Sequence, residues 1–494
     1  MTLNRKSRIV CFITTSALLL AAGCAVGPNF KKPPAPNVPG YTPNPLSTTS
    51  STANVPDGEA QRFIEGRDIP GDWWTLFHSK PLNDLIERAL KNNPDIKAGQ
   101  AALSVARENV LAQRGAYYPS VGAGFSATHS KTSNEVSPFT ASGALYYSLY
   151  TPQVSVSFVP DVFGLNRRTV ESLRAQEQQA RFALVATHIT LSANVAAAAI
   201  QEASLRAQID ATRQLIEINT NMLQVLRKQF EKGYVGRLDV AAQESQLAQV
   251  TATLPPLLKQ LAQQRDLLDA LSGAFPNEDL AEKFDLSSFQ LPQELPVSLP
   301  SQLVEQRPDV RQAEQNMHSA CAQIGIAVAN RLPSFALTAD VGSMALVFSR
   351  MFEAGTGFWD LGASATQSIF QGGALVHHER AAQAAYVQAS EQYRSTVLTA
   401  FENVADTLHA LQEDADALKA AAAARDAAKV TLDLTTRQMQ VGYVSYLALL
   451  SAEQTYQQAL INLVQAQSNR YADTAALFQA LGGGWWNRAE IPKN

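Results

Sequence analysis

The side chains best able to bind a metal ion gather at one place in this chain, His377, His378 and Glu379. A zinc site on a helix typically needs two histidines four residues apart, so that both lie on one face, whereas these two are adjacent. The methionines form no cluster that would indicate a copper path. The sequence therefore predicts ordinary polar side chains near the start of a helix, and no metal site.

Catalytic patterns are equally absent from the sequence. No arrangement of Ser, Cys and His indicates an activated nucleophile, and the glycine-rich segments 122–124 and 482–484 precede no phosphate-binding helix. The formal net charge of −4 gives no basic surface for nucleic acid. We predict a protein that needs no cofactor, binds no nucleic acid and is not an enzyme.

Residues 1–23 have the pattern of a signal peptide. Three basic residues precede an apolar core at 9–22, which is too short to span a bilayer. Removal of this segment takes away three basic residues and no acidic ones, which lowers the formal net charge from −4 to −7. The sequence thus predicts an exported protein.

The signal peptide ends in Leu20-Ala21-Ala22-Gly23-Cys24, which resembles the bacterial lipobox except that Ala21 stands where the pattern prefers Leu. The resemblance implies cleavage before Cys24 and a covalent lipid such as palmitate on that cysteine. Ala25, in place of Asp, favours sorting to the outer membrane. Ordinary cleavage beside a chance cysteine is the alternative. Cys321 is then the only other thiol of the mature chain, and we expect it to pack as a small side chain.

Two stretches of 68 residues, 165–232 and 374–441, contain neither proline nor glycine, and a glycine brackets each end of both. Their apolar residues recur with heptad spacing, as at Ile209, Ile216 and Leu223. An unbroken helix of this length is about 100 Å long. We predict two long rods that pack into a coiled-coil bundle.

The landmarks of the first half recur in the second. Pro308 and Pro333 repeat Pro94 and Pro119 at a spacing of 214 residues, and three later glycines repeat earlier ones at a spacing of 209. We therefore predict an internal duplication. The domains expected are a lipoprotein signal peptide (1–23), a lipidated extended segment (24–70), a first repeat (71–272), a linker (273–300), a second repeat (301–484) and a C-terminal tail (485–494).

Each repeat is predicted to contain short helices, a two-stranded hairpin, a long helix and a return helix. Apolar and small residues alternate at 121–127 and 153–158 in the first repeat, and at 334–341 and 361–366 in the second. The first return helix is expected at 238–254, with Pro255 and Pro256 breaking it before a further helix at 257–271.

Four strands cannot close into a barrel, and an open strand edge cannot lie in hydrocarbon. The strands therefore form a small soluble sheet, or several copies of the chain pool them. The export signal, the alternation and the aromatic residues near the strand ends favour a pooled membrane barrel. Three copies give twelve strands, whereas two give eight and a lumen packed with side chains.

At this point the chain resembles a known family, the outer-membrane factors of tripartite efflux systems (the TolC-like superfamily, and especially the OprM/NodT-type outer-membrane lipoproteins). The resemblance covers essentially all of the mature chain. The matching segments are Cys24-Ala25-Val26-Gly27-Pro28-Asn29-Phe30, Trp73-Trp74 with Phe77 and Pro81-Leu82, Arg307-Pro308-Asp309-Val310, Ile369-Phe370-Gln371-Gly372-Gly373 and Leu481-Gly482-Gly483-Gly484-Trp485.

The resemblance implies an α+β membrane protein in the outer membrane of a Gram-negative bacterium. It implies a homotrimer whose twelve-stranded β-barrel, with four strands per protomer, is continued by a long periplasmic α-helical coiled-coil tunnel. The implied partners are a periplasmic adaptor (membrane fusion protein), an inner-membrane RND-type pump and outer-membrane lipids. The implied function is a passive channel that exports small molecules such as drugs. The alternatives are the duct of a type I protein secretion system and a structural coiled-coil envelope lipoprotein.

The chain reverses after each long helix, and the resemblance implies that these reversals contact the adaptor. The residues concerned are Gly233, Tyr234, Val235, Gly442, Tyr443 and Val444. Helix termination by the glycines alone is the simpler alternative. The resemblance also implies a periplasmic gate here, with Asp239 as part of a negative collar. The second reversal has uncharged residues where relatives often carry charge, so an apolar constriction by Tyr443, Tyr446 or Leu447 is the substitute. For Asp239, the alternative is a charge that stabilises the start of a helix.

Overall fold

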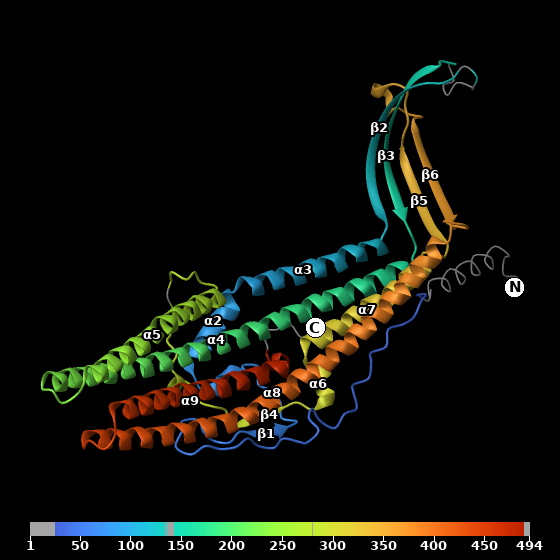
Figure 1. Cartoon of the computed structure of the whole chain (residues 1–494). Helices are drawn as coiled ribbons and strands as arrows, with labels where there is room; N and C mark the ends of the chain where they lie inside the picture. Colours follow the sequence, from blue (N-terminus) through green and yellow to red (C-terminus); the bar gives the residue numbers. More distant parts are fainter. Residues whose placement is uncertain (1–24, 134, 136–142, 279, 489–494) are drawn as a thin grey trace. The chain divides into compact units, whose positions relative to one another are not determined.

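The computed structural model describes residues 25–133, 135, 143–278 and 280–488 (Figure 1). Cys24, the predicted lipidation site, lies outside the described residues. The chain divides into two compact units, each containing segments from both halves of the sequence. We name them the strand unit (the described residues of 25–32, 103–180 and 313–393) and the bundle unit (those of 33–102, 181–312 and 394–488).

The order of elements is the same in the two halves of the chain. The first half contains α2 (Lys80–Asn92), α3 (Pro94–Arg114), β2 (Ser120–Lys131), β3 (Tyr146–Phe158), α4 (Leu165–Glu231) and α5 (Arg237–Ser272). The second half contains α6 (Pro300–Gln306), α7 (Pro308–Ala329), β5 (Ser334–Ser343), β6 (Gly357–Thr366), α8 (Ala374–Gln440) and α9 (Tyr446–Ala480).

The prediction of two long unbroken helices is confirmed, because α4 and α8 each contain 67 residues. Gly164 and Gly373, with φ of +80° and +85°, immediately precede them. One stretch of α4 is long and apolar enough to cross a membrane, but most of it is buried, as in a packed core helix. Packing therefore accounts for its apolar character.

Helix α5 differs from its prediction, because it runs through both Pro255 and Pro256. Each proline lacks an N–H, so the carbonyls of Thr251 and Ala252 lose their helical donors. All four residues are exposed, so water can replace the missing donors. The predicted break is wrong because the helix loses only two hydrogen bonds, both at positions open to solvent.

Two short strands that the sequence patterns did not indicate lie in the N-terminal segment and the linker. Strand β1 (Arg62–Glu65) pairs in parallel with β4 (Glu294–Val297), and Glu65 lies opposite Val297. The segment 24–70 and the linker 273–300 are thus joined by a two-stranded sheet in the bundle unit.

The core of the bundle unit is rich in aromatic side chains. Trp73 and Phe77, on the short 3₁₀ helix Trp73–Phe77, are fully buried. The rings of Trp73 and Phe478 stack at 5.3 Å, and those of Phe289 and Tyr471 lie 5.8 Å apart. This cluster joins the start of the first repeat to the end of α9.

In the strand unit, four antiparallel strands form one sheet in the order β2-β3-β5-β6 (Figure 1). The register places apolar side chains on one face, namely Val121, Phe125, Val154, Val156, Leu337, Val341, Trp359 and Leu361. Several are strongly exposed, with Trp359 at 74% and Leu361 at 72%. The opposite face is polar, and there Asp340 lies opposite Asp360 and accepts a hydrogen bond from the Ser155 hydroxyl.

The first described residues are held against helices of the strand unit. The buried Arg168 guanidinium donates to the carbonyls of Val26 and Gly27 and to the Asn29 side chain at 2.8–3.2 Å. Cys321 is buried beside this segment, and its Sγ lies 3.7 Å from the Pro28 carbonyl oxygen. Burial and the Glu171 carboxylate raise the pKa of the Cys321 thiol. The prediction that Cys321 packs as a small side chain is confirmed.

Candidate functional site

The reversals after α4 and α8 have the same backbone geometry. Gly233 and Gly442 adopt φ of +78° and +82°, a left-handed conformation that glycine adopts without a steric penalty. The amides of Tyr234 and Tyr443, one residue further on, each donate to a carbonyl five residues earlier, at 2.9 Å. Both helices therefore end in the Schellman arrangement, which requires glycine at these two positions.

Asp239 lies in the first turn of α5, where it accepts a hydrogen bond from the Gly236 backbone N–H at 3.0 Å. This contact satisfies one of the donors that a helix start leaves unpaired, and the carboxylate interacts favourably with the helix dipole. The geometry accounts for Asp239 as a helix-starting residue. Its role in a gate remains a prediction.

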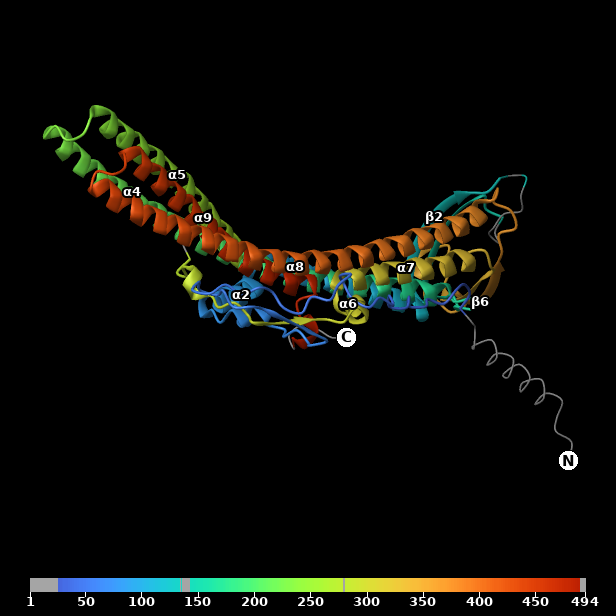
Figure 2. The ribbon, with the colours of Figure 1, turned by 60° about the horizontal axis from the view of Figure 1, so that its bottom comes forward.

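The ends of α4 and α5 lie beside those of α8 and α9 (Figure 2). A buried apolar cluster joins these ends within the bundle unit. Its members are Leu223, Leu226, Val240, Tyr446 and Leu449. Partly buried side chains pack around it, among them Met222, Val235, Leu432 and Met439. We call this set the tip cluster, and it holds the α4–α5 reversal against the α8–α9 reversal.

The predicted contact residues differ in exposure. Tyr234 and Tyr443 are 78% and 83% exposed, and Leu447 is 54% exposed. Tyr446, in contrast, is only 6% exposed and belongs to the tip cluster. A constriction formed by Tyr446 would therefore require the cluster to open, whereas Tyr443 and Leu447 are already accessible.

A groove of about 1020 Å³ lies between the ends of α4 and α8. It brings together six residues that the sequence predicts as contact or gate residues, namely Tyr234, Val235, Asp239, Gly442, Val444 and Tyr446. The remaining wall is mixed, with apolar residues such as Ile218 and Met439 beside polar ones such as Asn221. The two reversals thus form one continuous surface on the protomer.

A sequence profile of the family described as Outer membrane efflux protein matches residues 85–274 and 299–483, more than half of the chain. This chain belongs to that family. The two matched segments lie in the two halves that the glycine and proline landmarks define. The predicted resemblance to outer-membrane factors of efflux systems is confirmed. The family is one of transport proteins rather than enzymes.

Individual relatives match over nearly the whole chain. The toluene efflux pump outer membrane protein TtgF of Pseudomonas putida is 29% identical over 97% of this chain and 98% of its own. The probable outer membrane lipoprotein SilC of Salmonella typhimurium is 26% identical over 96% and 98%. The Campylobacter jejuni CmeC outer membrane channel superimposes with a TM-score of 0.83 at 19% identity, covering 95% of this chain and 97% of CmeC.

These likenesses give this efflux protein the fold of TolC-like outer-membrane channels and an outer-membrane location. They favour neither the protein-secretion duct nor the structural lipoprotein.

Sequence reasoning missed a layer of buried polar side chains behind the tip cluster. Gln243, on α5, is fully buried and donates to the backbone and side-chain oxygens of Asn219 at 2.9 and 3.0 Å. Glu453, on α9, is 5% exposed, and its Oε2 has no hydrogen-bond partner among the described residues. Burial raises the pKa of Glu453 to about 7. This efflux protein therefore carries a carboxyl group that titrates near neutral pH inside its tip.

The position of Glu453 in the sequence could have indicated that its carboxyl group is buried. It lies seven residues after Tyr446, two turns along α9, so both side chains project from one face. A carboxyl group on an otherwise apolar face is unusual. Burial, then the carboxyls of Glu453 and Asp239, raise the pKa of the Tyr446 hydroxyl.

The cluster His377-His378-Glu379 is placed at the start of α8, as predicted. Glu379 forms an ion pair with Arg331. Within the part of the chain that the structure describes, no three His, Cys, Asp or Glu side chains gather as a metal site would require.

Proposed function

We propose that three copies of this chain form a passive channel across the outer membrane, as the outer component of a tripartite efflux pump. The main support for this proposal is the four-stranded sheet. Its apolar face suits hydrocarbon and its polar face suits a water-filled lumen. Strands β2 and β6 are its edges, and an edge cannot stay unpaired in a bilayer. Pairing β6 of one copy with β2 of the next satisfies both edges.

Three copies provide a twelve-stranded barrel with room for a lumen, whereas two provide eight strands and an interior filled by side chains. Cysteines placed along β2 and β6 of a Cys321→Ser chain test this closure. We expect pairs in register to crosslink adjacent copies into dimers and trimers and nothing larger. A tetramer, or dimers alone, would contradict the trimer.

The energy for transport must come from a partner. We propose that a periplasmic adaptor binds at the reversals, where Tyr234 lines the groove and Tyr443 is exposed, and that an RND-type pump delivers substrates. Relatives named for toluene and cation efflux support small molecules as the exported class.

A photo-crosslinking residue at Tyr234 tests the adaptor contact in intact cells. We expect capture of a periplasmic adaptor that co-purifies with a proton-driven pump. The same residue at Val105, also exposed but on α3, serves as the control and should capture no adaptor. An adaptor that co-purifies with an ATP-binding cassette pump would replace this proposal with secretion.

We further propose a lipid on Cys24. Cys24→Ser should abolish labelling of the protein by palmitate, and a labelled variant would contradict the assignment.

A further inference from the structure

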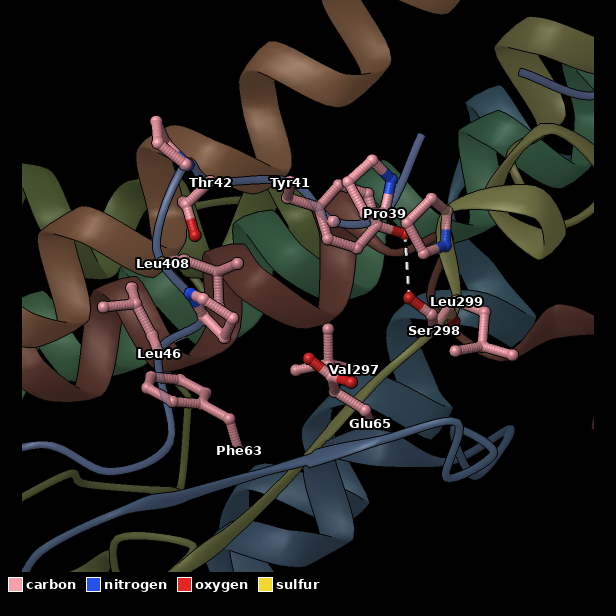
Figure 3. Close-up of a pocket in the computed structure, with 14 residues that line it drawn as sticks. Pro39, Tyr41, Thr42, Leu46, Phe63, Glu65, Val297, Ser298, Leu299 and Leu408 are labelled. Atoms are coloured by element: carbon pink, nitrogen blue, oxygen red, sulfur yellow. Dashed lines mark hydrogen bonds between the residues drawn. The ribbon is translucent and has the colours of Figure 1, made fainter. Parts of the chain in front are cut away.

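A small cavity in the bundle unit lies between the N-terminal segment, the β1–β4 sheet and helix α8 (Figure 3). Its volume is about 140 Å³. We call residues 39–46, which form its outer wall, the strap. Every residue around the cavity belongs to the bundle unit, so the cavity is formed within one compact body.

Part of the cavity lining is apolar. Leu46 of the strap, Phe63 of β1, Val297 of β4 and Leu408 of α8 line it, and the last three are buried. An engineered cavity of about 150 Å³ in another protein, lined by Leu, Ile and Phe, stays dry and binds benzene. The strap cavity therefore suits an apolar group of about that size.

One charged side chain breaks this apolar lining. Alternation along β1 places Glu65 on the same face as the buried Phe63, and the register sets it beside the buried Val297. Glu65 is exposed, so its carboxylate lies at the rim of the cavity. The alternation along β1 predicts an apolar residue at this position, and Glu65 departs from that prediction.

Among the described residues, no cation pairs with Glu65. The guanidiniums of Arg62 and Arg67 both pair with Glu294, at 2.6 and 2.5 Å. Across the described ranges, no ion pair reaches the Glu65 carboxylate. The rim thus presents a free negative charge beside an apolar interior.

A second polar group lines the same cavity. Ser298 is 2% exposed, and its Oγ has no hydrogen-bond partner in the part of the chain that is described. Its carbonyl already accepts a hydrogen bond from the Tyr41 hydroxyl at 2.8 Å, which fixes the strap over the cavity (Figure 3). A buried hydroxyl without a partner is unfavourable, and a bound polar group would satisfy it.

We propose that the strap cavity binds a small amine whose apolar body is about the size of a benzene ring. The apolar body fills the space among Leu46, Phe63 and Leu408. The ammonium group donates hydrogen bonds to Glu65 at the rim, and Ser298 Oγ offers a second acceptor. This binding site does not depend on channel formation, because all of its groups lie on one protomer.

A calorimetric titration of benzylamine into the full-length protein, purified in detergent, tests the proposal. We expect saturable binding with one molecule per chain. Toluene, which matches the ring but lacks the charge, should bind at least about tenfold more weakly. Phenylacetate, which places a carboxylate near Glu65, should not bind. Toluene binding as tightly as benzylamine, or no saturable binding of benzylamine, would overturn the proposal.

Two variants locate the site. Glu65→Gln should weaken benzylamine binding about tenfold or more and leave toluene binding unchanged. Glu278→Gln removes an exposed carboxylate elsewhere on the bundle unit and serves as the matched control, with unchanged affinity. Equal affinities of these two variants for benzylamine would place the amine elsewhere.

Ser298→Ala separates binding from folding. It should weaken benzylamine binding and leave the melting temperature unchanged or higher, because it removes a buried hydroxyl that has no partner. A lower melting temperature with unchanged affinity would show that Ser298 only supports the fold, and would remove it from the site.

Discussion

Glu244 and Glu453 occupy equivalent positions in the two repeats, 209 residues apart, yet their surroundings differ. Glu244, on α5, is partly exposed and forms an ion pair with Arg227 of α4 at 2.9 Å. Glu453, on α9, is buried, and the position equivalent to Arg227 is Thr436. The same residue type thus forms a solvated ion pair in one hairpin, whereas in the other its carboxyl group has no ion-pair partner among the described residues.

The difference extends to the neighbouring positions. Asn219 and Gln243, hydrogen-bonded in the first hairpin, correspond to buried Ala428 and Ala452 in the second. Residues 229–243 contain four charged side chains, whereas the equivalent segment 438–452 contains none. The glycines that set the backbone are shared, so the repeats keep the geometry of the reversal and differ in its side-chain chemistry.

Glu453→Gln should have the largest effect on the free energy of unfolding. A folded-state pKa of about 7, above the usual 4.5, means that the folded protein holds a proton which the unfolded chain releases. Its stabilising effect is therefore complete at acidic pH and is lost as the pH rises towards 7. Above that pH, the variant should be more stable than the wild type by about 2–3 kcal/mol.

Hydrogen exchange of the amides in α9, measured between pH 5 and 8 and corrected for intrinsic rates, checks this prediction. Protection should fall with rising pH in the wild type and fall less in Glu453→Gln, in which burial and Asp473 of α9 still raise the pKa of Asp414 to about 7. Glu244→Gln is the matched control and should retain the wild-type pH dependence. If both variants behave alike, the two environments do not differ as the structure indicates.

Asn219→Ala should have the next largest effect. It removes the side-chain acceptor of the buried Gln243 amide and leaves only the backbone carbonyl of residue 219. The expected cost is about 0.5–1.5 kcal/mol in the free energy of unfolding. The double variant with Gln243→Ala, which imitates the alanine pair of the second hairpin, should cost less than the sum of the two single changes. Denaturant titration of the three variants measures the coupling, and strict additivity would contradict the hydrogen bond.

Asp239→Ala gives the first reversal the residue found at the equivalent position of the second, Ala448. Loss of the contact with the Gly236 N–H should cost about 1 kcal/mol. If Asp239 also contributes to a collar, cation preference or resting conductance should change in bilayer recordings. Unchanged currents with lower stability would leave Asp239 as a helix-starting residue alone.

Arg227→Ala should have the smallest effect. It removes an exposed ion pair, so stability should fall by less than about 1 kcal/mol, and less at high salt. A large effect that persists in 1 M salt would show that the first hairpin depends on this pair and would weaken the contrast with Glu453.

Local rules predicted much of this fold. Residues 165–232 and 374–441 lack helix breakers, so heptad spacing and flanking glycines were enough to predict α4 and α8 within one residue. Alternation located the strands of the main sheet. The break at Pro255 was wrong because solvent exposure, which the sequence does not reveal, determines what a missing N–H costs.

The candidate site was predictable only in part. Gly233 and Gly442 mark the reversals, and the residues beside them line one groove. The burial of Glu453 depends on which face of α9 packs against α5, and that contact joins separate repeats. Strands β1 and β4 were missed because each has four residues and its partner is more than 200 residues away.

The pairing of β1 with β4 also constrains the order of assembly. Residues 62–65 leave the ribosome early, but their partner at 294–297 follows only after the whole first repeat has been made. Contacts of such separation form late, because a long loop must be closed first. The N-terminal segment must therefore wait, extended and open to proteases, until the linker is available.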